Sequence, residues 1–184
     1  KAASMEANLV FADQQWKVTR TQNPDASQLA RFQVQGRSDA FEWEFGLRGD
    51  YQRFNLPGIL EAVEQLRQKG WNLSKEALHM GLARVSEQTG LKGRWHILQT
   101  QPLTIADTGH NEAGILEVVN QLKRYPYSQL WMVIGMVNDK DISKVLDLLP
   151  LEASYIFCQA DIPRAMDADE LASKARAKGR TALE

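Results

Sequence analysis

A polar corner near the middle of the chain contains residue types that could bind a ligand or move a proton. Asp107, Gly109, His110 and Asn111 lie there, between a short apolar run and an apolar pattern with helical spacing. The run predicts a buried strand and the pattern predicts a helix. In open α/β sheets, ligands bind where a strand ends and the next helix begins, and the N-terminus of a helix favours anions. The corner is therefore a candidate ligand site.

Each residue of this corner also has a simpler interpretation. Asp107 could accept hydrogen bonds from both hydroxyl groups of a ribose, or it could be a loop or helix-capping acid. His110 could be a ligand or a proton carrier, or a solvated loop histidine. Asn111 is most simply an N-cap, a role that does not exclude a ligand contact. The spacing alone leaves these alternatives open.

The elements expected after residue 90 would place the corner on a parallel sheet. We expect strands at 95–98, 102–107, 129–137 and 154–158, and helices from Asn111, Asp141 and about Asp167. Residues 129–137 are almost continuously apolar, which is typical of a strand buried on both faces. Alternating strands and helices predict right-handed crossovers, so residues 91–184 are expected to form a Rossmann-like domain. The strand ends would bring polar groups at 138–141 and 159–164 to the same rim as Asp107.

The first 90 residues predict a smaller arrangement of strands. Residues 41–45 alternate aromatic residues with glutamates, which is the pattern of a half-buried strand. Glycine and aspartate at 36–39 suit a turn to an antiparallel partner strand at 32–35. Further short strands are expected at 9–11 and 16–18.

Two amphipathic helices are expected after this hairpin. Asn55 is the expected N-cap of the first helix, because its side chain can accept from the free N–H groups of the first turn. Gly70 would end that helix. Ser74 would cap the second helix and Gly90 would end it.

The composition excludes several classes of protein. The chain has 184 residues, is 43% hydrophobic and carries a formal net charge of -1, so it can bury a core and has no field that favours nucleic acid or an anionic membrane. No apolar run approaches the roughly 20 residues of a membrane span, and the start has no apolar signal core. The single cysteine, Cys158, is expected to be a buried apolar side chain. A soluble, cytoplasmic protein is expected.

Four segments of the chain resemble, in order, the signature motifs of one enzyme family. They are Leu47-x-Gly49-x-Tyr51-Gln52-x-x-Asn55, Gly90-Leu-x-Gly93-Arg94-Trp95, Asp107-Thr-Gly109-His110-Asn111, and Gly135-Met-Val-Asn-Asp139-Lys140-Asp141 followed by Pro163-Arg164-Ala165. This ordered set resembles the folylpolyglutamate synthase/dihydrofolate synthase family of the Mur ligase superfamily. The set departs from the family pattern at Tyr51, Lys92 and Gly109, where histidine, proline and alanine are common.

The resemblance implies an α/β fold in two parts. Residues 1–90 would be the C-terminal part of a central ATP-binding domain, with a β-hairpin and two helices. Residues 91–184 would be the Rossmann-like Mur ligase C-terminal domain, also called the glutamate ligase domain, without its last strand and helix.

The resemblance also implies an activity. Enzymes of this family use ATP and Mg²⁺ to convert a carboxylate of dihydropteroate or a (poly)glutamyl folate into an acyl phosphate, which the amine of L-glutamate attacks. Asn55 would contact the adenine, Arg94 the phosphates and Asp107 the ribose. An amide matches the edge of adenine in donor and acceptor, and a guanidinium suits phosphate oxygens.

The remaining matches would lie on the substrate side of such a site. His110 is the candidate catalytic residue, and it would bind substrate together with Asn111 and Arg164. The partners would be the small molecules ATP, L-glutamate and dihydropteroate or folate, without nucleic acid or membrane. The parent protein is expected to be a monomer.

One motif of the family is absent from the chain. No G-x-x-x-x-G-K-[ST] segment occurs, since no glycine is followed by lysine. The phosphate-binding loop and the Mg²⁺ ligands are therefore expected in an N-terminal region outside this chain, which begins with Lys1 and is expected to end without a closing strand. The chain alone is expected to be inactive. Two alternatives stay open: a cell-wall Mur ligase that adds an amino acid to a UDP-muramyl substrate, and a non-catalytic nucleotide-binding module.

Overall fold

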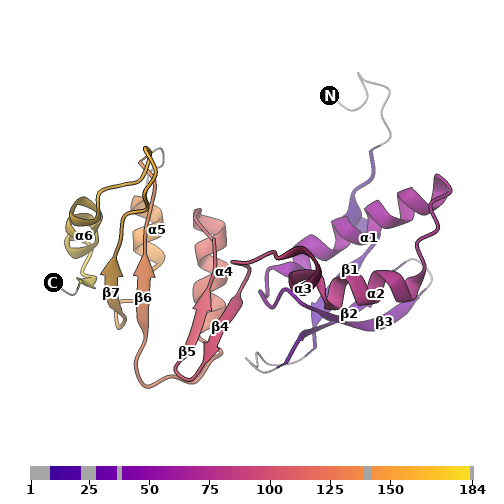
Figure 1. Cartoon of the computed structure of the whole chain (residues 1–184), viewed down its shortest axis with the longest axis horizontal. Coiled ribbons are helices and arrows are strands. Elements are labelled where there is room, and N and C mark those ends of the chain that lie inside the picture. The colour runs from indigo at the N-terminus through magenta and orange to yellow at the C-terminus, as the bar shows by residue number, and fades with distance from the viewer. Residues whose placement is uncertain (1–8, 22–27, 37–38, 139–141, 183–184) are drawn as a thin grey trace. The chain divides into compact units, whose positions relative to one another are not determined.

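The computed structural model describes residues 9–21, 28–36, 39–138 and 142–182. The chain divides into two compact units, Lys1–Asp107 and Thr108–Glu184, and each is described by itself (Figure 1). Both units contain helices and β-strands, in agreement with the predicted α/β class. The domain boundary that the sequence predicts after residue 90 falls inside the first unit and remains a prediction. Among the described residues, no helix is both long and apolar enough to cross a membrane.

The first unit is built on an antiparallel sheet with the strand order β1-β2-β3. These strands are β1 (Lys17–Arg20), β2 (Ala30–Gln35) and β3 (Ala40–Phe45). Phe32 lies opposite Trp43 in the register of β2 and β3, and successive side chains alternate between a buried and an exposed face. The predicted hairpin is therefore confirmed. The strand predicted at 9–11 is wrong, because these residues are exposed and lead into a short 3-10 helix, η2 (Ala12–Gln14).

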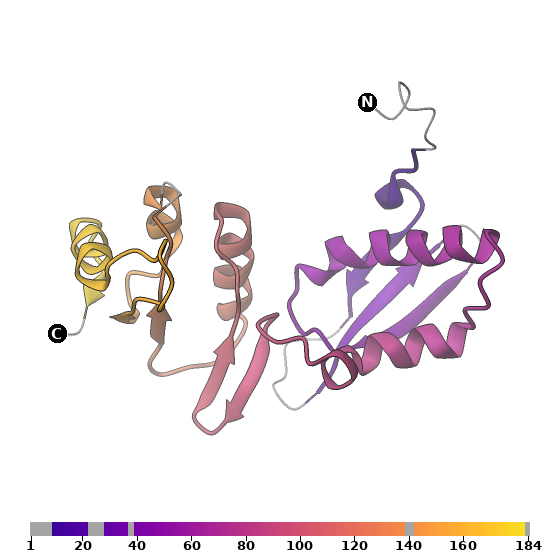
Figure 2. The same ribbon diagram turned by 45° about the horizontal axis from the view of Figure 1, so that its top comes forward.

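Three helices follow this sheet in the first unit. They are α1 (Gln52–Gln68), α2 (Lys75–Ala83) and α3 (Val85–Thr89). Leu56 and Leu60 of α1 and Leu82 of α2 join Phe32 and Phe45 in one core cluster. Because these strand residues share the buried face of the sheet, α1 and α2 both run alongside that face (Figure 2).

The ends of these helices confirm two predicted caps and correct a third. Ser74 caps α2, its hydroxyl accepting from the N–H of Ala77. The single helix predicted between Ser74 and Gly90 is wrong, because α2 ends at Ala83 and a separate helix, α3, begins at Val85. Gly90 ends α3 in the left-handed conformation with φ 69°. The predicted N-cap at Asn55 is wrong, because α1 already begins at Gln52. The first N–H groups of α1 donate to carbonyls of the preceding turn, so they need no side-chain cap.

A two-stranded antiparallel hairpin completes the first unit. Its strands are β4 (His96–Thr100) and β5 (Leu103–Ala106). The sequence predicts residues 102–107 as a strand of a parallel sheet, but among the described residues β5 pairs with β4 in the antiparallel direction. Only Gln101 and Pro102 connect the two strands. Such a short connection cannot join parallel neighbours, which need a crossover of about a dozen residues or more.

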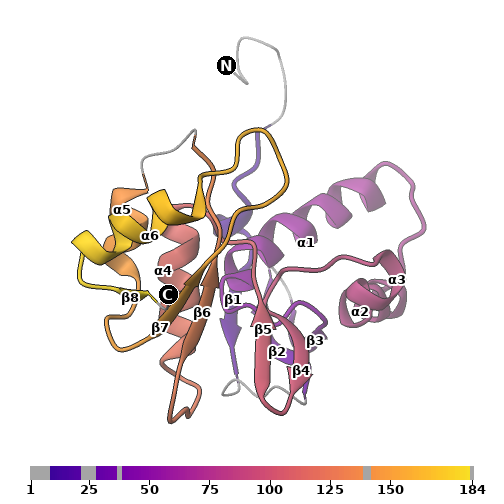
Figure 3. The same cartoon turned by 60° about the vertical axis from the view of Figure 1, so that its left-hand side comes forward.

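The second unit contains a parallel sheet that includes two of the four predicted strands. In chain order its elements are α4 (Glu112–Leu122), β6 (Trp131–Ile134), α5 (Ser143–Leu148), β7 (Ser154–Phe157), α6 (Ala168–Ala177) and β8 (Thr181–Ala182). Strands β6, β7 and β8 are parallel neighbours in that order, with the helices beside them (Figure 3). The expectation that the chain ends without a closing strand is wrong, because Thr181 and Ala182 pair with Ser154 and Tyr155.

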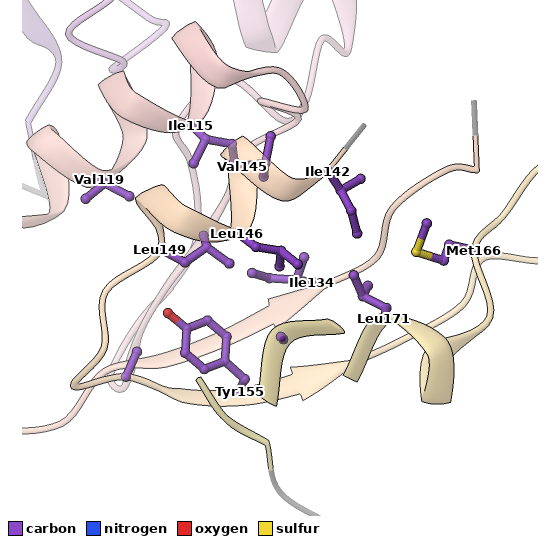
Figure 4. Close-up of a cluster of buried hydrophobic side chains, with 12 residues drawn as sticks. Ile115, Val119, Ile134, Ile142, Val145, Leu146, Leu149, Tyr155, Met166 and Leu171 are labelled. Carbon is purple, nitrogen blue, oxygen red and sulfur yellow. The ribbon is translucent and has the colours of Figure 1, made fainter. Parts of the chain in front are cut away.

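The core of the second unit lies between this sheet and its helices (Figure 4). Ile134 and Tyr155 face this core from β6 and β7, whereas Val133 is 67% exposed on the other face. The prediction that residues 129–137 form a strand buried on both faces is therefore wrong, since only one face of β6 is covered. Cys158, which follows β7, is exposed rather than buried.

Candidate functional site

One carboxylate joins three segments of the first unit. Asp107 follows β5 directly and accepts two hydrogen bonds on its Oδ2 atom. The hydroxyl of Tyr51 donates the first over 2.7 Å, and the backbone N–H of Trp95 donates the second over 2.7 Å. Tyr51 precedes α1 and Trp95 precedes β4. The carboxylate therefore links the start of a helix to the backbone that enters the hairpin.

The turn before α1 sets the direction of the Tyr51 ring. Gly49 makes room for this ring, because a Cβ atom added at Gly49 would lie 2.6 Å from it. Arg20 of β1 holds the same turn through an ion pair with Asp50 at 2.5 Å. Burial, followed by the hydrogen bond to Asp107, raises the pKa of Tyr51 well above its usual range. The phenol therefore keeps its proton, and the hydrogen bond to Asp107, even at moderately alkaline pH.

The backbone on both sides of Arg94 adopts an uncommon conformation. Gly93 and Trp95 lie in the left-handed region, with φ values of 73° and 50°. This region costs a residue with a Cβ atom about 1–2 kcal/mol. Two features hold Trp95 there: its N–H bonds to Asp107, and its residue is only 1% exposed. The side chain of Arg94, between the two, is exposed.

Asn55 lies on α1, one helical turn after Tyr51, with its side chain exposed. Tyr51 is the residue immediately before α1, and Asn55 is four positions further along the chain. The Nδ2 atom of Asn55 donates to Oε1 of Gln52 over 2.8 Å. All three predicted nucleotide contacts, Asn55, Arg94 and Asp107, thus lie in the first unit, and Asp107 contacts Tyr51 directly.

Tyr51 is the residue of this arrangement that sequence reasoning missed. It stands out in the sequence only as a departure from the family pattern, which has histidine at this position. No spacing rule connects residue 51 with residues 95 and 107. The one signal in the sequence that could have pointed to Tyr51 was its position in the motif that also contains Gly49 and Asn55.

The other predicted site residues belong to the second unit. Two of them, His110 and Asn111, immediately precede α4. Asn111 caps this helix as predicted, its Oδ1 atom accepting from the N–H of Gly114 over 2.8 Å. His110 is exposed, and its Nδ1 atom lies 3.1 Å from the carbonyl oxygen of Thr108. When Nδ1 carries the proton and donates a hydrogen bond to this carbonyl, Nε2 keeps a lone pair and can act as a base.

Arg164 lies on a segment that is tied to the carboxyl end of β6. The N–H of Asn138 donates to the carbonyl of Arg164 over 2.9 Å, and the Nδ2 atom of Asn138 donates to the carbonyl of Ala165 over 3.1 Å. The side chain of Arg164 is exposed. The polar residues 139–141, with the helix start expected at Asp141, lie outside the described residues.

The described residues contain no ligand set for the Mg²⁺ that the resemblance implies. Within 9–21, 28–36, 39–138 and 142–182, no three His, Cys, Asp or Glu side chains come together as a metal site.

The parallel unit and the residues before it match a known family. Residues 93–184 match the family model described as Mur ligase, glutamate ligase domain. The chain belongs to this family. The resemblance found in the sequence motifs is thereby confirmed.

Individual relatives are folylpolyglutamate synthases. The chain is 32% identical over 146 residues to a probable bifunctional folylpolyglutamate synthase/dihydropteroate synthase of Haloferax volcanii, covering 79% of this chain and 17% of that protein. It is 29% identical over 126 residues to a folylpolyglutamate synthase of Lacticaseibacillus casei, covering 67% of this chain and 28% of that protein. The chain thus spans less than a third of either relative.

A solved structure shares the fold of the chain. The folylpolyglutamate synthase of Mycobacterium tuberculosis, in complex with ADP and AMPPCP, superposes with a TM-score of 0.83 at 24% identity. The match covers 100% of this chain and 41% of that one. This likeness shows a common fold over the whole chain.

Proposed function

We propose that the chain is part of an ATP-dependent ligase that joins L-glutamate to dihydropteroate or a (poly)glutamyl folate through an acyl phosphate. The match of residues 93–184 to the glutamate ligase domain carries this proposal. The folylpolyglutamate synthases among its relatives support the folate substrate, and the relative with bound ADP and AMPPCP supports the nucleotide. Because the chain spans less than a third of its sequence relatives, it would supply one wall of the site and be inactive alone.

The first unit would bind the nucleotide. Arg94 would contact the phosphates, since an exposed guanidinium forms charge-assisted hydrogen bonds with phosphate oxygens. Asp107 would contact the ribose, because a carboxylate can accept hydrogen bonds from both hydroxyl groups of the sugar. Asn55 would contact the adenine, because its amide offers both a donor and an acceptor.

The reaction would proceed in two steps. The carboxylate of the folate substrate attacks the γ-phosphorus of ATP, which forms the acyl phosphate and releases ADP. The amine of glutamate then attacks the acyl carbon, phosphate leaves, and the nitrogen loses a proton. Arg94 beside the phosphates would stabilise the charge that develops during transfer. His110 is the candidate to accept the amine proton through Nε2, with Asn111 and Arg164 as substrate contacts.

Binding of ADP tests the nucleotide half of this proposal. Isothermal titration calorimetry would compare the chain with Arg94→Ala and Asp107→Ala. We expect Arg94→Ala to weaken ADP binding at least about tenfold, because a hydrogen bond to a charged group contributes about 1.5–3 kcal/mol. Arg84→Ala is the matched control, since Arg84 is an exposed arginine of the same unit that pairs with Glu87. Equal affinities for the chain and Arg94→Ala would contradict the proposal.

Product formation tests the ligase half. The chain would be incubated with ATP, Mg²⁺, L-glutamate and a folate, and glutamylated folate would be measured by mass spectrometry. We expect no product from the chain alone, because the phosphate loop would have to come from another segment. Glutamylated product in this assay would show that the chain is more than one wall of the site.

A further inference from the structure

We propose that Tyr51 is a positioning residue, which acts through Asp107 and Trp95 to hold Arg94 where the nucleotide phosphates would bind. The hydroxyl of Tyr51, the carboxylate of Asp107 and the N–H of Trp95 form what we call the clasp. The role assigned to Arg94 rests on the proposed function. The contacts of the clasp do not depend on it.

The clasp holds the backbone beside Arg94 from outside that segment. Its two donors reach the same carboxylate oxygen, each over 2.7 Å. The Tyr51 ring packs so closely on Gly49 that an added Cβ atom there would lie 2.6 Å from it. Because the ring is held in this way, its hydroxyl fixes the carboxylate of Asp107. The carboxylate in turn accepts from the N–H of Trp95 in this left-handed conformation.

Trp95 needs such a restraint because its conformation is unfavourable. A residue with a Cβ atom stays in the left-handed region only when the surrounding structure compels it, and Trp95 has a φ of 50°. Burial of the residue, which is 1% exposed, anchors the side chain. The bond to Asp107 anchors the N–H. Loss of the Tyr51 hydroxyl would remove one of the groups that hold the carboxylate and would weaken this second anchor.

Arg94 is the residue that the clasp directs. It lies between Gly93 and Trp95, so these two left-handed residues set the direction of its Cα–Cβ bond. A change in the backbone at Trp95 would therefore change the direction of the Arg94 side chain, which carries the positive charge.

Hydrogen exchange at the amide of Trp95, followed by NMR, tests the clasp itself. Tyr51→Phe keeps the ring that packs on Gly49 and removes only the hydroxyl. We expect the Trp95 amide to exchange about tenfold faster in this variant, as the net contribution of one hydrogen bond implies. Tyr127→Phe is the matched control, because Tyr127 is an exposed tyrosine of the second unit. An unchanged exchange rate in Tyr51→Phe would overturn the clasp, whether or not the chain binds ADP.

The affinity for ADP tests the positioning role. We expect Tyr51→Phe to weaken ADP binding about fivefold, with an unchanged circular dichroism spectrum. In the Arg94→Ala background the same change should have a clearly smaller effect, because only the part that acts through Asp107 on the ribose would remain. An equal loss in both backgrounds would overturn the positioning role. If the chain and Arg94→Ala bind ADP equally, or if neither binds, the proposed function fails, while exchange at Trp95 still decides the clasp.

Discussion

Arg20 and Asp50 form a buried ion pair in the turn that leads to Tyr51. Their nitrogen and oxygen atoms are 2.5 Å apart, and their side chains are 7% and 11% exposed. Arg20 also donates to the carbonyl of Arg48 over 2.8 Å. Arg20, the last residue of β1, therefore fixes the connection between β3 and α1. This connection carries Tyr51, which contacts Asp107.

Arg20→Ala should destabilise the chain strongly. The change leaves the carboxylate of Asp50 buried without its cation, and breaking a buried pair in this way costs about 3–5 kcal/mol. Urea unfolding would measure the free energy of unfolding. The control is Arg31→Ala, whose pair with Glu44 is 47% and 42% exposed and should contribute about 0–1 kcal/mol. Similar small losses in both variants would show that the buried pair does not hold the turn.

Gly49→Ala should displace the Tyr51 ring. The added Cβ atom would lie 2.6 Å from the ring, and overpacking of this kind costs about 1–3 kcal/mol. Gly58 of α1 offers the opposite case, because an added Cβ atom there meets nothing within 4 Å. Gly58→Ala should stabilise the helix by up to about 1 kcal/mol. Thermal unfolding distinguishes the two, and a shift of the same sign in both variants would contradict the close contact at Gly49.

Asn111→Ala should destabilise α4 through the loss of its cap. The Oδ1 atom of Asn111 accepts from the N–H of Gly114 over 2.8 Å, and removal of such a cap costs about 0.5–2 kcal/mol. Asn111→Ser should retain most of the stability. Asn120→Ala is the control on the same helix, because Asn120 is exposed and lies inside α4. If urea unfolding showed no difference between Asn111→Ala and Asn120→Ala, the cap would not stabilise the helix.

Alkaline pH should destabilise the chain through Tyr155. Burial raises the pKa of Tyr155 to about 12, from a usual value of about 10, and the hydroxyl donates to the carbonyl of Pro150. The folded state thus holds this proton more tightly than the unfolded state does. The resulting stabilisation is complete below about pH 10 and is lost as the pH rises to about 12.

Tyr155→Phe isolates this effect, because phenylalanine has no proton to lose. Its free energy of unfolding should fall less between about pH 10 and pH 12 than that of the unchanged chain. Tyr127→Phe, which alters an exposed tyrosine, should follow the unchanged chain. Parallel curves for Tyr155→Phe and the unchanged chain would rule out Tyr155 as the source of the alkaline loss.

Features that depend only on a short stretch of the chain, such as strand faces and helix caps, were predictable from the sequence. The alternation at 41–45 predicts the face that β3 buries, because side chains of a strand alternate between two faces. Ser74 and Asn111 were predictable as caps because each bonds to the backbone of its own helix. The motif match was also local, since each signature occupies a continuous stretch. Asn55 failed as a cap because a turn upstream already satisfies the first N–H groups of α1.

The α/β class, the order of the motifs and the candidate contacts Asn55, Arg94 and Asp107 could all be read from the sequence. The pairing of β5 with β4, and the contact of Tyr51 with Asp107 across 56 positions of the chain, became visible only in the folded structure. The left-handed conformation of Trp95 belongs with them. These features depend on hydrogen bonds between distant segments, and no local spacing in the sequence records which distant segments meet.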